Sequence, residues 1–308
     1  MQLVGRFAPS PSGRMHLGNV LCALLAWLSA RRQGGEYLLR IEDLDAMRCP
    51  RSYADLIMED LRWLGLDWDG EVLYQSERAP VYERYEAVLR GKGLLYPCFC
   101  SRAALHAASA PHLSDGRVVY AGTCRDLTAD EVAERRKSRA PATRVRVPDE
   151  IVRFTDAVLG DYAENLTEEC GDFIIRRSDG VFAYQLAVVV DDALSGVTEV
   201  VRGADLLTST PRQIWLYRLL GFAPPAFAHI PLLCDHDGRR LSKRDGDLDL
   251  GLLRARFTPE QVVGVLACAA GLTDTPAPVA ARELVDGFSW DKLPRGELYL
   301  PNVFRQQA

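Results

Sequence analysis

The sequence lacks any apolar run long enough to span a membrane, so nothing in it predicts a transmembrane helix. A signal peptide is not expected either, because Arg6 and the proline-rich turn after it interrupt the first apolar residues. The eight cysteines of the 308 residues are irregularly spaced, which argues against a disulfide scaffold. We therefore expect a cytoplasmic protein with no membrane partner.

An excess of positive charge is also missing. The formal net charge is −5 and the sequence pI is about 5.6, so the composition does not indicate general nucleic-acid binding. An RNA-binding protein of this charge must gather its cations locally, and the candidates are Arg135, Arg136, Lys137, Arg139, Arg144, Arg146, Arg176 and Arg177. Alternatively, Glu131 and Glu134 pair with the first of these cations on an exposed helix, and the sequence leaves both interpretations open.

A strand, a tight turn and a helix are predicted at the start of the sequence. Leu3–Ala8 has the pattern of a strand, Pro9–Gly13 forces a turn, and apolar residues recur at helical spacing from Leu17 onward. The first turn of such a helix binds anions, because its backbone N–H groups are unpaired and its dipole is positive there. Gly18 permits close approach of a ligand, and His16 can donate a hydrogen bond to a phosphate oxygen. Many α/β proteins nevertheless begin in this way, and a lone histidine at a helix start is often only a surface residue.

A second candidate phosphate-binding segment is strongly cationic. It contains Arg239, Arg240, Lys243 and Arg244, together with the hydroxyl of Ser242, and it follows a predicted strand in the apolar stretch from Phe227 to Leu233. A cationic loop beside a bound triphosphate stabilises the charge that develops on departing pyrophosphate. The alternative is a solvated basic loop.

Taken together, the two segments resemble the signatures of class I aminoacyl-tRNA synthetases. His16-Leu17-Gly18-Asn19 resembles the HIGH signature, with Asn19 in place of its last histidine. Arg240-Leu241-Ser242-Lys243-Arg244 resembles the KMSKS signature, with arginine in place of its first lysine and its last serine. The residues before the first signature have the form seen in the glutamyl and glutaminyl branch, and the resemblance continues through Leu39–Asp45, Tyr184–Ala187 and Val201–Leu207.

The resemblance implies an enzyme that uses ATP and Mg²⁺ to convert L-glutamate into glutamyl-adenylate. It implies His16 and Lys243 as catalytic residues, and ATP-binding roles for His16, Gly18, Asn19, Arg240, Leu241, Ser242, Lys243 and Arg244. The implied glutamate-binding residues are Arg6, Phe7, Ala8, Pro9, Ser10, Glu42, Tyr184 and Arg202. Their chemistry is suitable, because Glu42 can pair with an ammonium group and Arg202 can bind a carboxylate with two hydrogen bonds. Alternatively, Arg202 and Glu42 form an ordinary ion pair.

The expected fold class is α/β, with a Rossmann-type parallel sheet split by an insertion. Residues 1–95 and 173–245 are assigned to the catalytic domain, 96–172 to an inserted α+β zinc-containing subdomain of acceptor type, and 246–308 to a helical region that contacts the tRNA stem. Residues 246–308 are too few for an anticodon-binding domain. The sheet is expected to resume near Phe173, where Tyr184–Val190 and Thr198–Arg202 are apolar and β-branched.

Several helix starts and ends are also predicted. Ser52 is expected to cap a helix, and Val81–Lys92 is expected to form another. A third helix is expected over Thr210–Leu220, with Pro211 in its first turn, and Thr258 begins a capping box.

A metal site is predicted in the insertion from Cys98, Cys100 and Cys124, because zinc favours sulfur-rich tetrahedral sites. The fourth ligand is open between His106, His112 and Tyr120, and chemistry alone favours histidine. Short glutamyl-type enzymes that modify queuosine carry Cys-x-Cys followed by Tyr-x-x-x-Cys around zinc, and this resemblance points to Tyr120, with His112 in reserve. One structural Zn²⁺ per chain is expected, and three unrelated thiols are the alternative.

The nature of the acceptor follows from the resemblance to these short enzymes. Full glutamyl-tRNA synthetases continue into an anticodon-binding domain, whereas residues 245–308 can form only a small helical platform. The implied acceptor is a hydroxyl on the cyclopentene ring of queuosine, at the wobble position of tRNA(Asp), with the anticodon arm held by a monomeric enzyme. The rival hypotheses are charging of the tRNA 3′ end, an inactive synthetase-like RNA-binding module, and a nucleotidyltransferase that acts on a small metabolite.

Overall fold

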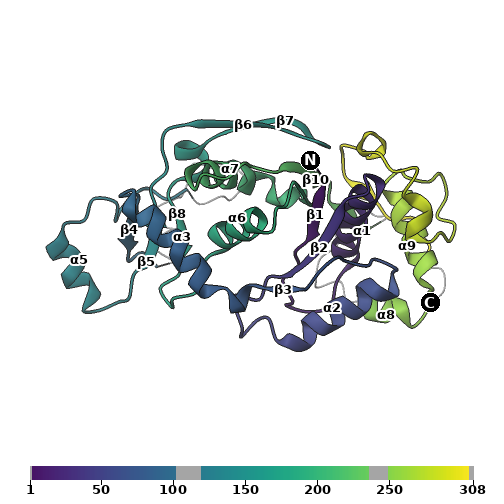
Figure 1. The fold of residues 1–308 in the computed structure, drawn as a ribbon, viewed down its shortest axis with the longest axis horizontal. Helices are drawn as coiled ribbons and strands as arrows, with labels where there is room; N and C mark the ends of the chain where they lie inside the picture. The colour runs from purple at the N-terminus through teal and green to yellow at the C-terminus, as the bar shows by residue number, and fades with distance from the viewer. Residues whose placement is uncertain (1, 102–118, 236–248, 305–308) are drawn as a thin grey trace.

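The computed structural model describes residues 2–101, 119–235 and 249–304 (Figure 1). The KMSKS-like segment from Arg240 to Arg244, and also His106 and His112, lie outside the described residues. The helices are α1 (Leu17–Arg32), α2 (Arg51–Trp63), α3 (Ala79–Gly91), α5 (Ala129–Arg136), α6 (Tyr184–Leu194), α7 (Thr210–Leu219), α8 (Leu250–Arg254) and α9 (Pro259–Ala269). Shorter helical turns are η1 (Gln75–Glu77), η2 (Leu166–Cys170), η3 (Ala204–Ser209), η5 (Ala281–Leu284) and η6 (Trp290–Lys292).

The strands form parallel and antiparallel groups. They are β1 (Val4–Phe7), β2 (Glu36–Ile41), β3 (Leu73–Tyr74), β4 (Leu95–Cys98), β5 (Ala142–Val145), β6 (Ile151–Asp156), β7 (Gly160–Asn165), β8 (Phe173–Arg176), β9 (Glu199–Gly203), β10 (Ala226–Ile230), β11 (Leu233–Cys234) and β12 (Leu298–Tyr299). β1, β2 and β3 pair in parallel in that order, and β9 pairs in parallel with β10.

The two parallel groups meet at β1 and β9. The Val4 N–H donates to the Thr198 hydroxyl at 2.9 Å, and the Thr198 N–H donates to the Val4 carbonyl at 2.9 Å. β1 and β9 are therefore neighbours at the centre of the parallel arrangement, although they are far apart in sequence. The expectation of alternating strands and helices around a parallel sheet is confirmed for this part of the chain.

Helix α1 is central because nearly all of its side chains from Leu17 to Ala30 are apolar or small. It packs on β1 and β9, and the core that surrounds it includes Val262, Val265 and Leu266 of α9. A helix that is apolar on all sides must be covered on all sides. Figure 1 accordingly shows α1 between the parallel strands and the C-terminal helices.

The insertion has its own antiparallel sheet, which corrects the expectation that the parallel sheet resumes near Phe173. β8 begins there, but it pairs antiparallel with β5, which pairs antiparallel with β4. β6 and β7 form a separate hairpin. The parallel strands resume only at β9, and the division into domains at residues 95 and 173 remains a proposal.

Residues Tyr184–Val190 form part of helix α6 and not a strand of the sheet, contrary to the sequence-based expectation. The segment from Leu186 to Val190 is completely buried, so its β-branched residues reflect burial on all sides. A short apolar run of this kind does not distinguish a buried strand from a buried helix. Thr198–Arg202, in contrast, falls largely within β9 as expected.

Predictions of the helix ends have mixed outcomes. α7 begins at Thr210 with Pro211 in its first turn, and Thr258 and Gln261 form the predicted capping box at α9. Ser52 was wrongly predicted as a cap, because α2 begins at Arg51 with the extended residue Pro50 at its N-cap. The ring of Pro50 fixes its φ angle at about −65°, which suits a residue at the start of a helix. Ser52 lies inside the first turn, past the capping position.

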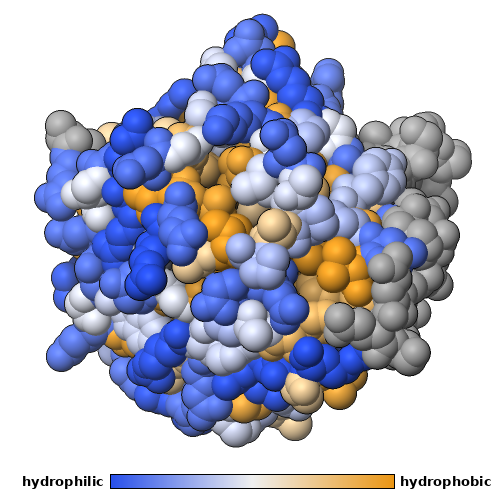
Figure 2. Space-filling view, turned by 90° about the vertical axis from the view of Figure 1, so that its right-hand side faces the viewer, coloured by the Kyte–Doolittle hydropathy of each residue, from blue (hydrophilic) through white to orange (hydrophobic). Residues whose placement is uncertain are grey.

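The C-terminal region returns to the parallel strands. β12 pairs in parallel with β11, which joins Leu298 to Leu233 and Tyr299 to Cys234. On the face formed by this region, apolar areas are separated by hydrophilic residues (Figure 2). Across the described ranges, no helix is both long and apolar enough to cross a bilayer.

Candidate active site and metal centre

A cavity of about 690 Å³ lies at the carboxyl ends of β1, β2, β9 and β10. Ligands of parallel α/β sheets bind at such ends. Its lining includes all the predicted glutamate-binding residues and the described part of the predicted ATP site: Arg6, Phe7, Ala8, Pro9, Ser10, His16, Gly18, Asn19, Glu42, Tyr184 and Arg202. The fold therefore brings together the described residues that the sequence singled out.

His16 is the N-cap of α1, and its side chain is oriented by the helix that it caps. Its Nδ1 accepts a hydrogen bond from the Gly18 N–H at 3.1 Å. A neutral imidazole that accepts at Nδ1 carries its proton at Nε2, so that nitrogen is a donor. The first turn of α1 contains no acidic side chain, and its positive dipole end is thus not neutralised within the helix.

The described residues on both sides of 236–248 border the cavity. Leu232 and Leu233, just before this segment, line it. Just after the segment, Asp249 forms a backbone bridge with His16, and the Leu250 N–H donates to the Met15 carbonyl at 3.1 Å. Predicted residue Lys243 lies between these anchors in sequence.

Arg6 and Glu42 belong to a buried charge network that also contains Arg40 and Asp192. Arg6 Nε lies 3.3 Å from Asp192 Oδ1, and Arg40 lies 2.5 Å from the same oxygen and 3.2 Å from Glu42 Oε1. Burial raises the pKa of Glu42, and the nearby Arg40 and Arg6 only partly oppose this effect. Burial also acts on Asp192, but Arg40 and Arg6 hold its pKa below the usual value.

Arg40 and Asp192 were not among the predicted site residues. A signal for Asp192 was present, because Asp191 and Asp192 follow an otherwise apolar run and α6 buries both. Charged residues are fully buried only when they are paired. Each carboxylate does have partners, since Asp191 binds Arg78, Gln75 and Tyr82 while Asp192 binds the two arginines.

Arg202 has a different environment, and within the described ranges its side chain is bonded to uncharged groups. It donates hydrogen bonds to Gln213 at 2.7 Å, Thr210 at 2.6 Å, Tyr184 at 3.3 Å and His229 Nε2 at 3.1 Å. The alternative of an ion pair with Glu42 is not what the structure shows, because Glu42 pairs with Arg40. Arg202 therefore presents an oriented cation to the cavity.

The basic cluster of the insertion is largely used within the protein. Lys137 pairs with Glu134 at 2.5 Å, while Glu131 completes the capping box of α5 and forms no ion pair with a described residue. The other members with partners are Arg139 (Phe99 carbonyl), Arg144 (Asp172 carbonyl and Cys98), Arg146 (Asp126), Arg176 (Glu83 and Glu86) and Arg177 (Asp45 and Asp179). Arg135 and Arg136, in the last turn of α5, remain candidates for RNA contact.

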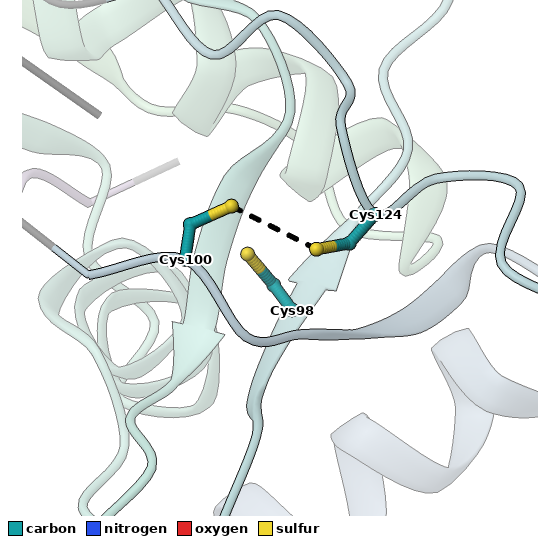
Figure 3. A group of neighbouring side chains, drawn as sticks. All are labelled: Cys98, Cys100 and Cys124. Atoms are coloured by element: carbon teal, nitrogen blue, oxygen red, sulfur yellow. Dashed lines mark hydrogen bonds between the residues drawn. The ribbon is translucent and has the colours of Figure 1, made fainter. Parts of the chain in front are cut away.

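The three predicted thiols of the insertion converge. The sulfur atoms of Cys98, Cys100 and Cys124 point toward one another (Figure 3) and lie within 4.8 Å of each other. The Sγ atoms of Cys100 and Cys124 are 3.7 Å apart. This is close to the distance of about 3.8 Å between two thiolate sulfurs bound to one tetrahedral zinc. The donor set therefore fits zinc.

The hydroxyl of Tyr120 lies beside the thiols, 3.6 Å from Cys98 Sγ and 4.0 Å from Cys100 Sγ. It also accepts the Cys124 N–H at 2.7 Å. Arg144 donates a hydrogen bond to Cys98 Sγ at 3.2 Å, and this cationic donor favours the thiolate form of Cys98. The guanidinium carbon of Arg144 also lies 3.8 Å from the centroid of the Tyr120 ring. Tyr120 is thus placed to be the fourth ligand, whereas His106 and His112 lie outside the described residues.

Replacing Cys98 by serine is expected to reduce bound zinc from about one ion per chain nearly to zero, because a hydroxyl is a poor substitute for a thiolate ligand. Metal content by mass spectrometry tests this, and hydrogen exchange should show faster opening of β4 and β5. Cys268→Ser is the matched control, since Cys268 lies on α9, away from the cluster. Equal zinc in both variants would refute the site.

Comparisons with known proteins agree with this geometry. Residues 2–267 match the family model of class I tRNA synthetases (E and Q), catalytic domain. The chain is 51% identical to a glutamyl-Q tRNA(Asp) synthetase of Symbiobacterium thermophilum, over 97% of this chain and 96% of that one. It is 49% identical to the protein of the same name from Nitratidesulfovibrio vulgaris, over 96% and 95%.

Among solved structures, a glutamate tRNA ligase from Elizabethkingia meningosepticum, in complex with its amino acid, superposes with a TM-score of 0.84 at 28% identity. The match covers 100% of this chain and 69% of the ligase. The resemblance inferred from the two signatures is confirmed at the level of the family. The chain belongs to the class I tRNA synthetases of the glutamyl and glutaminyl branch, and it is a ligase similar to glutamyl-Q tRNA(Asp) synthetases.

Proposed function

We propose that this enzyme uses ATP to convert L-glutamate into glutamyl-adenylate and transfers the glutamyl group to the cyclopentene diol of queuosine in tRNA(Asp). The observation that carries the proposal is the arrangement of charges in one cavity, where the Arg202 cation, the Arg6–Glu42 network and the N-terminus of α1 meet. The names of the similar proteins support the choice of acceptor.

The cavity fits both ends of glutamate. Glu42 supplies a carboxylate for the substrate ammonium, while Arg6 and Arg40 share the single carboxylate of Asp192. Arg202 is bonded to neutral groups, and its four hydrogen bonds leave one N–H donor, on Nη2. A carboxylate that takes this donor and displaces the Tyr184 hydroxyl, 3.3 Å from Nη1, would be bound by two hydrogen bonds. Glutamine would leave this cation without a counter-charge in a buried site, which costs free energy.

In the first step, the α-carboxylate of glutamate attacks the α-phosphorus of ATP in line, and pyrophosphate leaves. The His16 Nε2–H and the positive end of the α1 dipole stabilise negative charge on the phosphates, and Lys243 is proposed to do the same for the leaving group. Mg²⁺ enters with ATP as part of the substrate. The chain need not supply a nucleophile, because positioning provides most of the catalysis.

In the second step, a ring hydroxyl of queuosine attacks the acyl carbon of the adenylate and AMP leaves. The exposed Arg135 and Arg136 of α5 are proposed to contact phosphates of the anticodon arm. Cys98, Cys100, Tyr120 and Cys124 would hold a zinc ion that fixes the loops after β4 and before α5.

The acceptor is tested with labelled glutamate, ATP and tRNA(Asp) with or without queuosine. Label should enter only the queuosine-containing tRNA, and it should still enter a tRNA that ends in a 3′-dideoxy nucleotide. Loss of acceptance by the 3′-dideoxy tRNA would instead show charging of the 3′ end. Absence of glutamate-dependent exchange of pyrophosphate into ATP would indicate a non-catalytic RNA-binding module.

A further inference from the structure

A buried chain of hydrogen bonds connects Arg202 at the cavity with the inserted hairpin. Arg202 Nε donates to His229 Nε2 at 3.1 Å, and His229 Nδ1 lies 2.6 Å from Asp156 Oδ2. The three residues come from β9, β10 and β6, and none is more than 5% exposed. Asp156 and His229 do not line the cavity, and among the described residues their hydrogen bonds lead to it through Arg202, directly and by way of the Thr210 hydroxyl, which lies 3.0 Å from His229 Nε2.

The hydrogen-bond partners fix the tautomer of His229. The guanidinium of Arg202 can only donate, so Nε2 of His229 must accept. Nδ1 then carries the proton and donates it to Asp156. An imidazole that accepts at Nε2 is neutral. Burial lowers the pKa of His229, and the nearby Arg202 lowers it further while Asp156 opposes them, which is in keeping with this.

Asp156 is held independently of the imidazole. Its Oδ1 accepts the backbone N–H groups of Val158 and Leu159 at 3.0 Å each, and the backbone N–H of residue 229 lies 3.1 Å from both carboxylate oxygens. Because this carboxylate is fixed by the backbone, it sets the orientation and tautomer of His229.

We propose that Asp156 and His229 are positioning residues that aim the guanidinium of Arg202 at the side-chain carboxylate of glutamate; this inference rests on the proposed function. A carboxylate placed directly against Arg202 would orient it as well, but it would compete with the substrate for the same cation. The neutral ring of His229 supplies the hydrogen-bond acceptor, and it lies between the Asp156 carboxylate and the Arg202 guanidinium. The positive charge of Arg202 thus stays available to the side-chain carboxylate of the substrate. The enzyme is therefore expected to prefer glutamate to glutamine.

Asp156→Asn tests this arrangement without altering any residue of the cavity. The amide oxygen can keep the Val158 and Leu159 hydrogen bonds, which places the amide NH₂ opposite His229 Nδ1. Nδ1 must then accept, the proton moves to Nε2, and two donors face each other at Arg202. We expect KM for glutamate in pyrophosphate exchange to rise about tenfold to a hundredfold, the scale for a lost hydrogen bond to a charged group. KM for ATP should change less than about twofold, because no ATP contact is altered.

A second measurement reads the tautomer directly, through the imidazole ¹⁵N chemical shifts, with His229→Gln used to assign the signals. The proton should reside on Nδ1 in the parent and on Nε2 in Asp156→Asn. Asp161→Asn is the matched control, because Asp161 is an exposed carboxylate on the same hairpin.

The outcomes separate the two hypotheses. A parent enzyme without glutamate-dependent exchange overturns the proposed function and the role of Arg202 with it. A parent that exchanges normally, with an Asp156→Asn variant whose KM for glutamate is unchanged, overturns the positioning role alone. A rise in both KM values to the same extent, or an unchanged tautomer, also contradicts it, because general loosening of the hairpin would not act on glutamate alone.

Discussion

Lys243→Ala is expected to slow glutamate-dependent exchange of pyrophosphate into ATP by about 30- to 900-fold. Negative charge develops on the leaving pyrophosphate, and removal of one preorganised electrostatic donor raises such a barrier by about 2–4 kcal/mol. The described residues before and after this segment border the cavity, at Leu233 and at Asp249 beside His16. The expected loss is therefore in the rate of activation, with a smaller effect on KM for glutamate.

Lys92→Ala provides the matched control, because Lys92 is an exposed lysine at the end of α3. Exchange should be measured without tRNA, so that effects on RNA binding do not enter. Parent-like exchange by Lys243→Ala would remove this lysine from the mechanism. If the melting temperature of Lys243→Ala falls together with its exchange rate, the loss of exchange reflects a folding defect and not the role of the lysine.

Arg202→Gln is expected to lower kcat/KM for glutamate by about 30- to 5,000-fold. The substrate carboxylate would lose a buried, charged, two-pronged partner, and loss of one member of such a pair costs about 2–5 kcal/mol. Arg202→Lys should also be impaired, since a lysine cannot form the same pair of parallel hydrogen bonds. The ratio of kcat/KM for glutamate to that for glutamine should fall, because the charge that distinguishes the two substrates is gone.

The control is Arg218→Gln on α7, where a half-exposed arginine approaches Glu150 at 3.7 Å. Melting temperatures are needed as well, because Arg202→Gln removes hydrogen bonds from Thr210, Gln213 and His229. Retention of the parent's preference for glutamate would show that another group binds the side-chain carboxylate.

The sequence predicted the strand, turn and helix at its start well because the evidence for them is local. Pro9–Gly13 and the apolar spacing after His16 specify a turn and a helix within a short stretch. The presence of Arg202 in the same cavity as His16 depends instead on contact between β1 and β9, which periodicity does not reveal. Only the family resemblance linked those segments.

The buried residues that hold the site residues in place were harder to predict. Asp192, Arg40, His229 and Asp156 are recognisable as candidate site residues only when their partners are known, and those partners lie on other elements. The misassignment of Tyr184–Val190 has the same origin, since complete burial hides the period that separates helix from strand. The cysteines were easier, because Cys98 and Cys100 are close in sequence and their spacing is itself chemical information.

The pairing of β11 with β12 has a consequence for biosynthesis. β11 borders the cavity at Leu233 and precedes Lys243 in the sequence, yet its partner strand, at Leu298–Tyr299, is translated long after it. A nascent chain leaves the ribosome N-terminus first, so β1, α1 and β2 can associate early. The strand that precedes Lys243 in the sequence nevertheless stays without its neighbour β12 until residue 299 has emerged. A partly translated polypeptide should therefore gain ATP-dependent activity only at a late stage of synthesis.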